Sequence, residues 1–176
     1  ISQYSQSSKG SHSMSQLLEK AEKAFDKKNY KYAIELWSQH LKLKPDDLET
    51  RKKLRKCMRE GAGRKKSGWF SKVRSFGAKS FPVNKKDPES TMHKCEDTLK
   101  DDPSNAGLLV RLGEACALAN HHEVAIWVFK DAITIDKKNK EAHRQAARSC
   151  VEIGEIEKAI EHYEKIVKLD PSDGEA

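Results

Sequence analysis

The amino-acid sequence predicts an all-α fold made of repeated helix pairs. Three apolar helical runs end in similar proline-containing signals, LKLKPDD, LKDDPSN and VKLDPSD. The last two prolines, Pro103 and Pro171, lie 68 residues apart, which is twice a 34-residue repeat period. The segment ITIDKKN marks the midpoint, with Lys137 in the place of the proline. With 36% hydrophobic and 35% charged residues, the chain suits an elongated fold with a thin core.

The period divides most of the chain into four repeats, three of which are uninterrupted. Repeat 1 is residues 14–47, repeat 3 is 106–139 and repeat 4 is 140–173. We expect the helices of these repeats at about 15–27 and 31–43, at 106–118 and 122–135, and at 140–153 and 156–169.

Repeat 2, residues 48–105, is interrupted. Pro45 and Pro103 are 58 residues apart, 24 more than one period. Helices are recognisable at about 48–60 and 88–100, and Pro88 suits a first helical turn. The additional residues, about 61–85, are therefore an insertion in the turn within the repeat.

The two ends of the chain fall outside the period. Residues 1–13 are rich in serine, and we expect a disordered arm or a cloning remnant there. Residues 174–176 would start a further segment or form a tail. Because no polar capping helix follows Pro171, we hypothesise that the chain is a fragment of a longer repeat protein or that a partner covers this end.

The residues of each repeat resemble those of the tetratricopeptide repeat. Repeat 3 has Leu109, Leu112, Gly113 and Cys116 in the first helix, and Ala125, Phe129 and Ala132 in the second. Repeat 4 departs from the pattern at His143, and cysteine replaces tyrosine in both repeats. The resemblance implies a right-handed superhelical solenoid of about four antiparallel helix pairs that binds proteins and has no catalytic activity.

The resemblance also implies a concave groove lined by the first helix of each repeat. Its inward positions include Glu22, Phe25 and Asp26 in repeat 1 and Glu114 in repeat 3. Cations at helical spacing and apolar residues between them make up our predicted groove site: Lys52, Lys56, Arg59, Val110, Leu118, Arg144 and Arg148.

Such a groove suits an acidic peptide or protein surface with one or two apolar anchors. The alternative is that the cations are solvated and pair with neighbouring acids, namely Glu49, Glu60, Glu141 and Glu152. Some family members hold chaperone C-termini through a fixed set of Lys, Asn and Arg residues. Leu18 and Glu22 stand where that set needs Lys and Asn, which argues against this role.

The insertion is basic and aromatic. Residues 64–86 contain eight Lys or Arg and no acid, whereas the net charge of the whole chain is +7. The cations of this segment therefore account for all of the net positive charge of the chain. Its candidate contact residues are Lys65, Lys66, Trp69, Phe70, Lys72, Arg74, Phe76 and Phe81.

Several roles are open for these residues. They could pack on the scaffold, even as a plug in its own groove, or contact another protein, including a second copy of the chain. The alternative function is that of a peripheral adaptor that binds an anionic membrane surface or a nucleic acid through the insertion.

The sequence contains no motif typical of catalysis or metal binding. It lacks a nucleophile elbow, a phosphate-binding loop and paired metal ligands, so we predict a protein that is not an enzyme and has no cofactor or metal. The cysteines, Cys57, Cys95, Cys116 and Cys150, are widely spaced. We expect buried thiols in a reducing compartment, the cytoplasm. No apolar run has the length of a membrane span.

Overall fold

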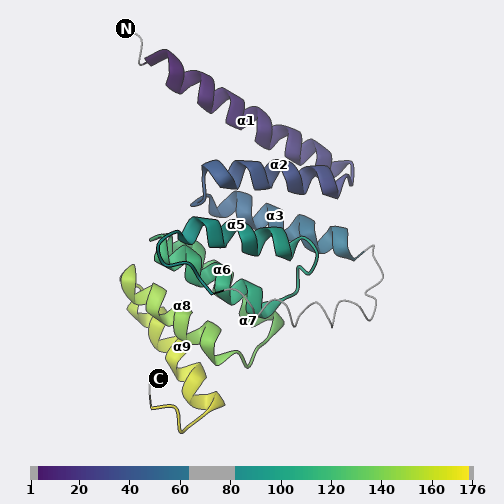
Figure 1. Cartoon of the computed structure of the whole chain (residues 1–176). Coiled ribbons are helices and arrows are strands. Elements are labelled where there is room, and N and C mark those ends of the chain that lie inside the picture. Colours follow the sequence, from purple (N-terminus) through teal and green to yellow (C-terminus); the bar gives the residue numbers. More distant parts are fainter. Residues whose placement is uncertain (1–3, 64–81, 175–176) are drawn as a thin grey trace. The chain divides into compact units, whose positions relative to one another are not determined.

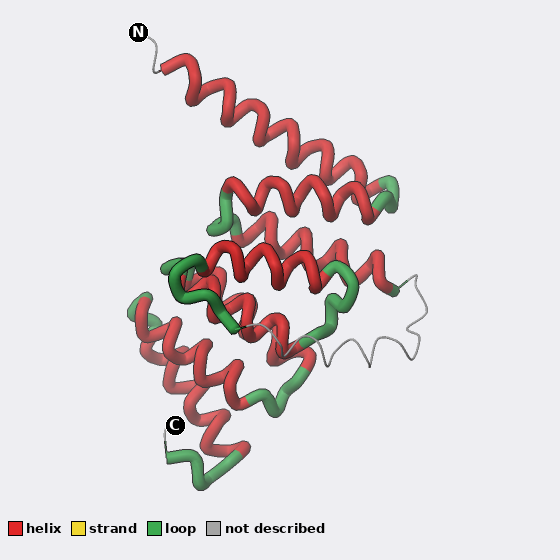
Figure 2. Tube along the Cα trace, in the orientation of Figure 1, coloured by secondary structure: helices red, strands yellow, loops and turns green. Residues whose placement is uncertain are grey.

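A computed structural model describes the chain at residues 4–63 and 82–174. These residues form eight α-helices and no strand (Figure 2). The helices are α1 (Tyr4–Asp26), α2 (Tyr30–Leu43), α3 (Leu48–Ala62), α5 (Pro88–Leu99), α6 (Ala106–Leu118), α7 (His122–Ile135), α8 (Lys140–Glu152) and α9 (Ile156–Leu169).

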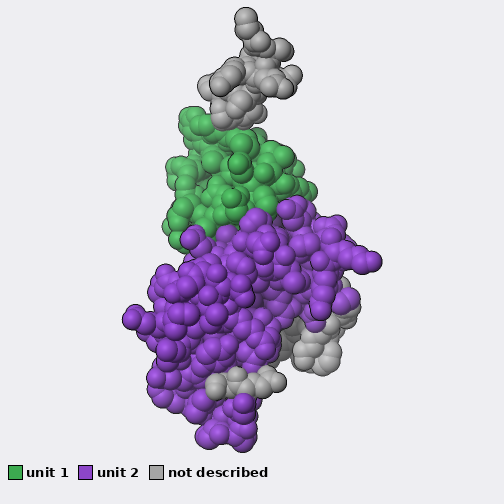
Figure 3. Space-filling view, turned by 90° about the vertical axis from the view of Figure 1, so that its left-hand side faces the viewer, with its two compact units in different colours: residues 1–66 green, residues 67–176 purple. Residues whose placement is uncertain are grey.

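The chain divides into two compact units, which Figure 3 shows in two colours. Unit 1 is residues 1–66 and unit 2 is residues 67–176. The division falls inside repeat 2, so its first helix, α3, belongs to unit 1 and its second helix, α5, to unit 2.

Helices that are consecutive in sequence pack against each other within each unit (Figure 1). In unit 1, α2 packs on both α1 and α3. In unit 2 every helix packs on the next, and α6 also contacts α8, the first helix of the following repeat. The predicted all-α helical repeat solenoid is thus confirmed.

The turns explain why the helices end at regular places. The turn inside repeats 1, 3 and 4 contains one residue with positive φ, at Lys28, Asn120 and Gly154. Asparagine or aspartate precedes most of the helices and accepts a hydrogen bond from a backbone N–H of the first turn, as N-cap residues do.

The helix bounds agree with the sequence prediction except at the N-terminus. α3 ends at Ala62 and α5 begins at Pro88, on either side of the predicted insertion. The first helix begins at Tyr4 instead of about Ser15, so the backbone is helical in much of the segment that we expected to be a disordered arm.

In repeat 3 a small residue on one helix allows a large residue on the other to approach closely. A Cβ atom added to Gly113 would lie 2.4 Å from the ring of Phe129, so only glycine allows this close approach. The four cysteines are also buried and form no disulfide, as predicted. Burial raises the pKa of Cys57 and of Cys95 to about 12, so neither thiol is a ready nucleophile.

Candidate binding surfaces

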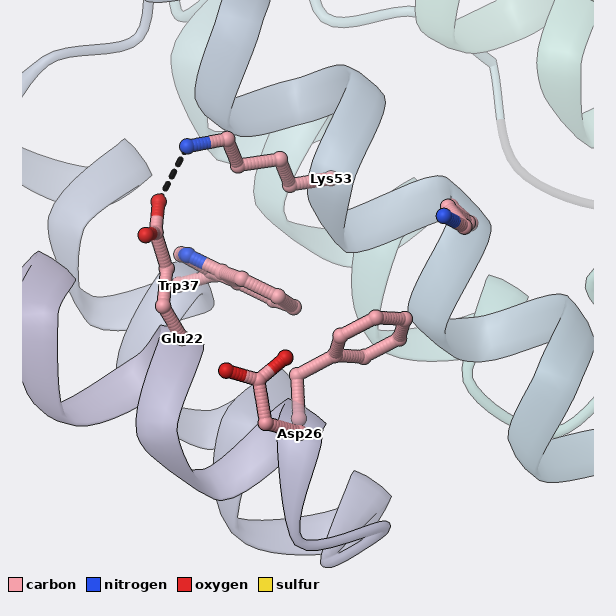
Figure 4. Close-up of a pocket in the computed structure, with 6 residues that line it drawn as sticks. Glu22, Asp26, Trp37 and Lys53 are labelled. Atoms are coloured by element: carbon pink, nitrogen blue, oxygen red, sulfur yellow. Dashed lines mark hydrogen bonds and ion pairs between the residues drawn. The ribbon is translucent and has the colours of Figure 1, made fainter.

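A pocket of about 230 Å³ lies in unit 1, among the helices α1, α2 and α3 (Figure 4). It is lined by two aromatic rings, two carboxylates and two ammonium groups, from Glu22, Phe25, Asp26, Trp37, Lys53 and Lys56. The pocket thus combines an apolar surface with charges of both signs.

The aromatic side chains form one cluster. The ring centroid of Phe25 lies 5.8 Å from those of Trp37 and Tyr30. Trp37 is only 2% exposed, and its indole Nε1 has no hydrogen-bond partner among the described residues. A buried donor without an acceptor is costly.

The charged residues around the pocket are paired in part. Lys53 forms an ion pair with Glu22 across the rim. The Nζ of Lys56 lies 5.4 Å from the centroid of the Phe25 ring and 3.9 Å from Glu60. These groups are at least 40% exposed, and such pairs are weak enough for a charged ligand to replace them.

Four residues of the pocket, Glu22, Phe25, Asp26 and Lys56, stand at inward positions of the predicted groove. Of these, only Lys56 belongs to the predicted groove site. Sequence reasoning missed Trp37 and Lys53 as pocket residues. The sequence identified Trp37 only as the large residue of the second helix of repeat 1. The periodicity does not predict whether such a residue borders a pocket.

The other predicted groove residues of unit 1 lie on α3. Lys52 forms an ion pair with Glu49 at 2.6 Å, so Lys52 and Lys56 both have the acidic neighbours that the alternative interpretation expected. Arg59 lies on the last turn of the same helix.

Unit 2 holds the remaining groove residues, and the structure changes the roles of two. The guanidinium group of Arg144 donates hydrogen bonds to both carboxylate oxygens of Asp173, at 2.7 and 3.0 Å, and pairs with Glu141 at 3.2 Å. Val110 is only 7% exposed and is part of the core, not an exposed anchor. Leu118 is exposed, at 45%, and Arg148 is exposed on α8.

The inward face of unit 2 also carries an acidic residue. Glu114, an inward position on α6, has a raised pKa, mainly because of burial, with Arg111 lowering it and Glu141 raising it. A raised pKa favours the neutral carboxyl group, so Glu114 offsets the neighbouring cations less than a solvent-exposed glutamate would.

The helix α9 carries an apolar stripe that sequence reasoning did not assign. It consists of Ile156, Ile160, Tyr163 and Val167, of which the three aliphatic residues are 44–53% exposed. A shallow pocket of about 370 Å³ lies on it, bordered by Glu164 and Lys168. The signal was the spacing i, i+4, i+7, i+11, which places all four on one helix face.

The predicted contact residues of the insertion, from Lys65 to Phe81, lie outside the described residues. Within the described ones, no cluster of three or more His, Cys, Asp or Glu could hold a metal ion. None of the described helices is both long and apolar enough to cross a bilayer.

Comparisons with known proteins agree with the repeat. The model of the family described as tetratricopeptide repeat matches residues 141–173. A search of curated proteins finds no match.

Solved structures with similar folds include a MamA mutant, at 18% identity and a TM-score of 0.50, covering 89% of this chain and 97% of that one. MamA from Desulfovibrio magneticus RS-1 has 16% identity and a TM-score of 0.47, with coverages of 92% and 77%. The first repeat domain of Spaghetti (RPAP3), solved with an HSP90 peptide, has 15% identity and a TM-score of 0.44, with coverages of 92% and 82%.

The fold and the packing of successive helix pairs define the chain as an all-α helical repeat protein. The last helix pair, residues 141–173, matches the tetratricopeptide repeat model, and the chain shares its fold with the MamA mutant.

Proposed function

We propose that this chain is a non-catalytic interaction scaffold that binds an acidic peptide or protein segment. The observation that carries the proposal is the pocket of unit 1, where Phe25, packed beside the buried ring of Trp37, offers an apolar surface next to the lysines of α3. α3 has six basic and two acidic residues. Arg51 and Arg55 are buried, and the four remaining cations still outnumber the two acids on the accessible side, which favours an acidic partner. An apolar side chain of the partner would rest on the ring of Phe25 while its carboxylates meet Lys52, Lys56 and Arg59.

The chain itself offers an analogy for this mode of recognition. On α8, Arg144 and Lys140 hold the carboxylate of Asp173. Because Arg144 is already paired with Asp173, we propose that the cations of α3 make most of the contacts with an acidic partner and that Arg148 contributes less.

The test is the binding of short acidic peptides, each with one large apolar residue, measured by fluorescence anisotropy. Lys56→Glu should weaken binding at least about tenfold, since it places a like charge against the ligand. The matched control is Lys42→Glu, an exposed lysine of α2 outside the pocket, which should change the affinity little. Equal losses in both variants, or no binding of any acidic peptide at low salt, would contradict the proposal.

We further propose that the insertion is either a second contact or a plug of the groove. A pull-down with a chain lacking residues 63–84 separates the two: partners gained on deletion indicate a plug, and partners lost indicate a contact. The free, buried thiols support a reducing compartment such as the cytoplasm as the proposed location.

A further inference from the structure

The pocket of unit 1 holds four charged groups, and three of them have a partner of opposite charge within the chain. Lys53 pairs with Glu22 across the rim, and the Nζ of Lys56 lies 3.9 Å from Glu60. The fourth charged group is the carboxylate of Asp26, which is exposed and points into the pocket (Figure 4). No described residue forms a hydrogen bond or an ion pair with it.

The position of Asp26 in α1 is unfavourable for a carboxylate. Asp26 is the last residue of the helix, where the negative end of the helix dipole disfavours an acid. Glu22 stands four residues earlier on the same helix, and like charges at this spacing repel each other. Lys23, which lies one turn before Asp26, pairs with Glu19 instead. Folding therefore gains nothing from the charge of Asp26, which leaves this charge available to a ligand.

The surroundings of Asp26 indicate what kind of group it can bind. Phe25 directly precedes it and provides the surface for the apolar anchor of a partner, so a group that reaches Asp26 belongs to a residue beside this anchor. A lysine or arginine there would donate charge-assisted hydrogen bonds to the carboxylate, and its methylene groups would lie on the apolar surface. An acidic side chain at the same place would be repelled.

We propose that Asp26 determines the specificity of the pocket by binding a lysine or arginine side chain of the partner, next to the apolar anchor. The partner is then a segment that is acidic overall but carries one cation beside its anchor. Its acids meet the lysines of α3, and its cation meets the end of α1. This inference rests on the function proposed for the pocket and adds a feature of the partner that the charge of α3 does not specify.

The test is a double-mutant cycle with two acetylated peptides. Both contain one leucine and the same glutamates, and they differ only in the residue beside the leucine, which is lysine in one and glutamine in the other. Acetylation leaves the lysine as the only cation. Measured by fluorescence anisotropy, Asp26→Asn should weaken the binding of the lysine peptide about three- to fivefold more than that of the glutamine peptide, as expected for a partly exposed ion pair.

The matched control is Glu35→Gln, which removes the same charge from an exposed residue of α2 outside the pocket. It should change the affinities of both peptides by the same factor, because it acts only through the net charge of the chain. In the absence of peptide, Asp26→Asn should unfold at the same temperature as the unmodified chain or at a slightly higher one, since it removes a negative charge from a helix C-terminus.

Three results would overturn the inference: the same loss for both peptides in Asp26→Asn, a preference for the lysine peptide that Glu35→Gln also removes, or a lower unfolding temperature of Asp26→Asn, which would give the carboxylate a structural role. The failure of this inference is distinguishable from the failure of the proposed function. If both peptides bind and Asp26→Asn does not discriminate between them, only the role of Asp26 is wrong. If neither peptide binds, the function proposed for the pocket is wrong as well.

Discussion

Two helix pairs with the same register, α1–α2 in unit 1 and α6–α7 in unit 2, fill the space between their helices differently. In α6–α7 the ring of Phe129 occupies the place where Gly113 would have a Cβ. The corresponding residues of α1–α2 are Ala21 and Trp37, and a pocket lies beside Trp37. The repeat therefore determines where a small residue meets a large one, while the residues chosen decide whether the space is filled or left as a binding pocket.

The largest effect is expected from Gly113→Ala. The added Cβ would lie 2.4 Å from a ring that is fully buried, and overpacking of this kind costs about 1–3 kcal/mol. Denaturant unfolding followed by circular dichroism should show the loss as a lower midpoint.

Two further variants sharpen this comparison. Gly107→Ala lies on the same helix with only an ordinary contact at 3.5 Å and should be neutral or slightly stabilising. Ala21→Gly should cost about 0.5–1 kcal/mol, the usual cost of glycine in a helix. If Gly113→Ala is as harmless as Gly107→Ala, the close approach does not hold α6 and α7 together.

Two other positions of the repeat distinguish a third pair, α8–α9. His143 and His162 face each other there, with their Nδ1 atoms 3.0 Å apart. In α6–α7 the corresponding residues are Leu109 and Val128, both fully buried. One ring must donate and the other accept, so both histidines cannot be protonated while this hydrogen bond exists.

The pair makes stability depend on pH. Burial first, then His143 and Lys130, lowers the pKa of His162 from its ordinary 6.5 to about 4. Burial and Lys165 lower the pKa of His143, although its imidazole donates a hydrogen bond to the backbone of Lys137. Between pH 6.5 and 4 the unfolded state binds more protons than the native state. The free energy of unfolding should therefore be highest above pH 6.5 and fall by on the order of 1 kcal/mol as the pH drops to 4.

The double variant His143→Leu with His162→Val, which restores the residue types of α6–α7, should remove this part of the pH dependence. Thermal unfolding at several pH values measures it, with His93→Gln on α5 as the control histidine. If stability depends on pH in the double variant but not in the His93→Gln control, then His143 and His162 are not the cause of the pH dependence.

The sequence predicted the helices well and the surfaces less well, for physical reasons. The period and the cap residues repeat along the chain, so the bounds of α3 and α5 could be read on both sides of the insertion. The burial of Val110 and the pairing of Arg144 with Asp173 depend on side-chain conformations at residues far apart in sequence, which periodicity does not determine. Three residues of the stripe, Ile160, Tyr163 and Val167, correspond to similar residues in α7, and only the structure shows that Ile126 is buried there while Ile160 is exposed.

The smallest effect is expected from Asp173→Asn, at a position that Asp47 occupies in repeat 1. Asp47 accepts hydrogen bonds from the backbone and hydroxyl of Thr50, at 2.9 and 2.8 Å, and caps α3. Asp173 instead pairs with Arg144 and Lys140 across the turn. Removing its charge should cost about 1 kcal/mol or less at low salt.

Because this cost is electrostatic, it should shrink in concentrated salt, whereas the loss caused by Asp47→Ala should persist, since an N-cap hydrogen bond is local and is worth about 1 kcal/mol. Denaturant unfolding of both variants in urea, at low and high sodium chloride, separates the two roles. A penalty for Asp173→Asn that does not change with salt would mean that Asp173 stabilises repeat 4 by hydrogen-bond geometry, as Asp47 does in repeat 1, and that Arg144 needs no carboxylate beside it.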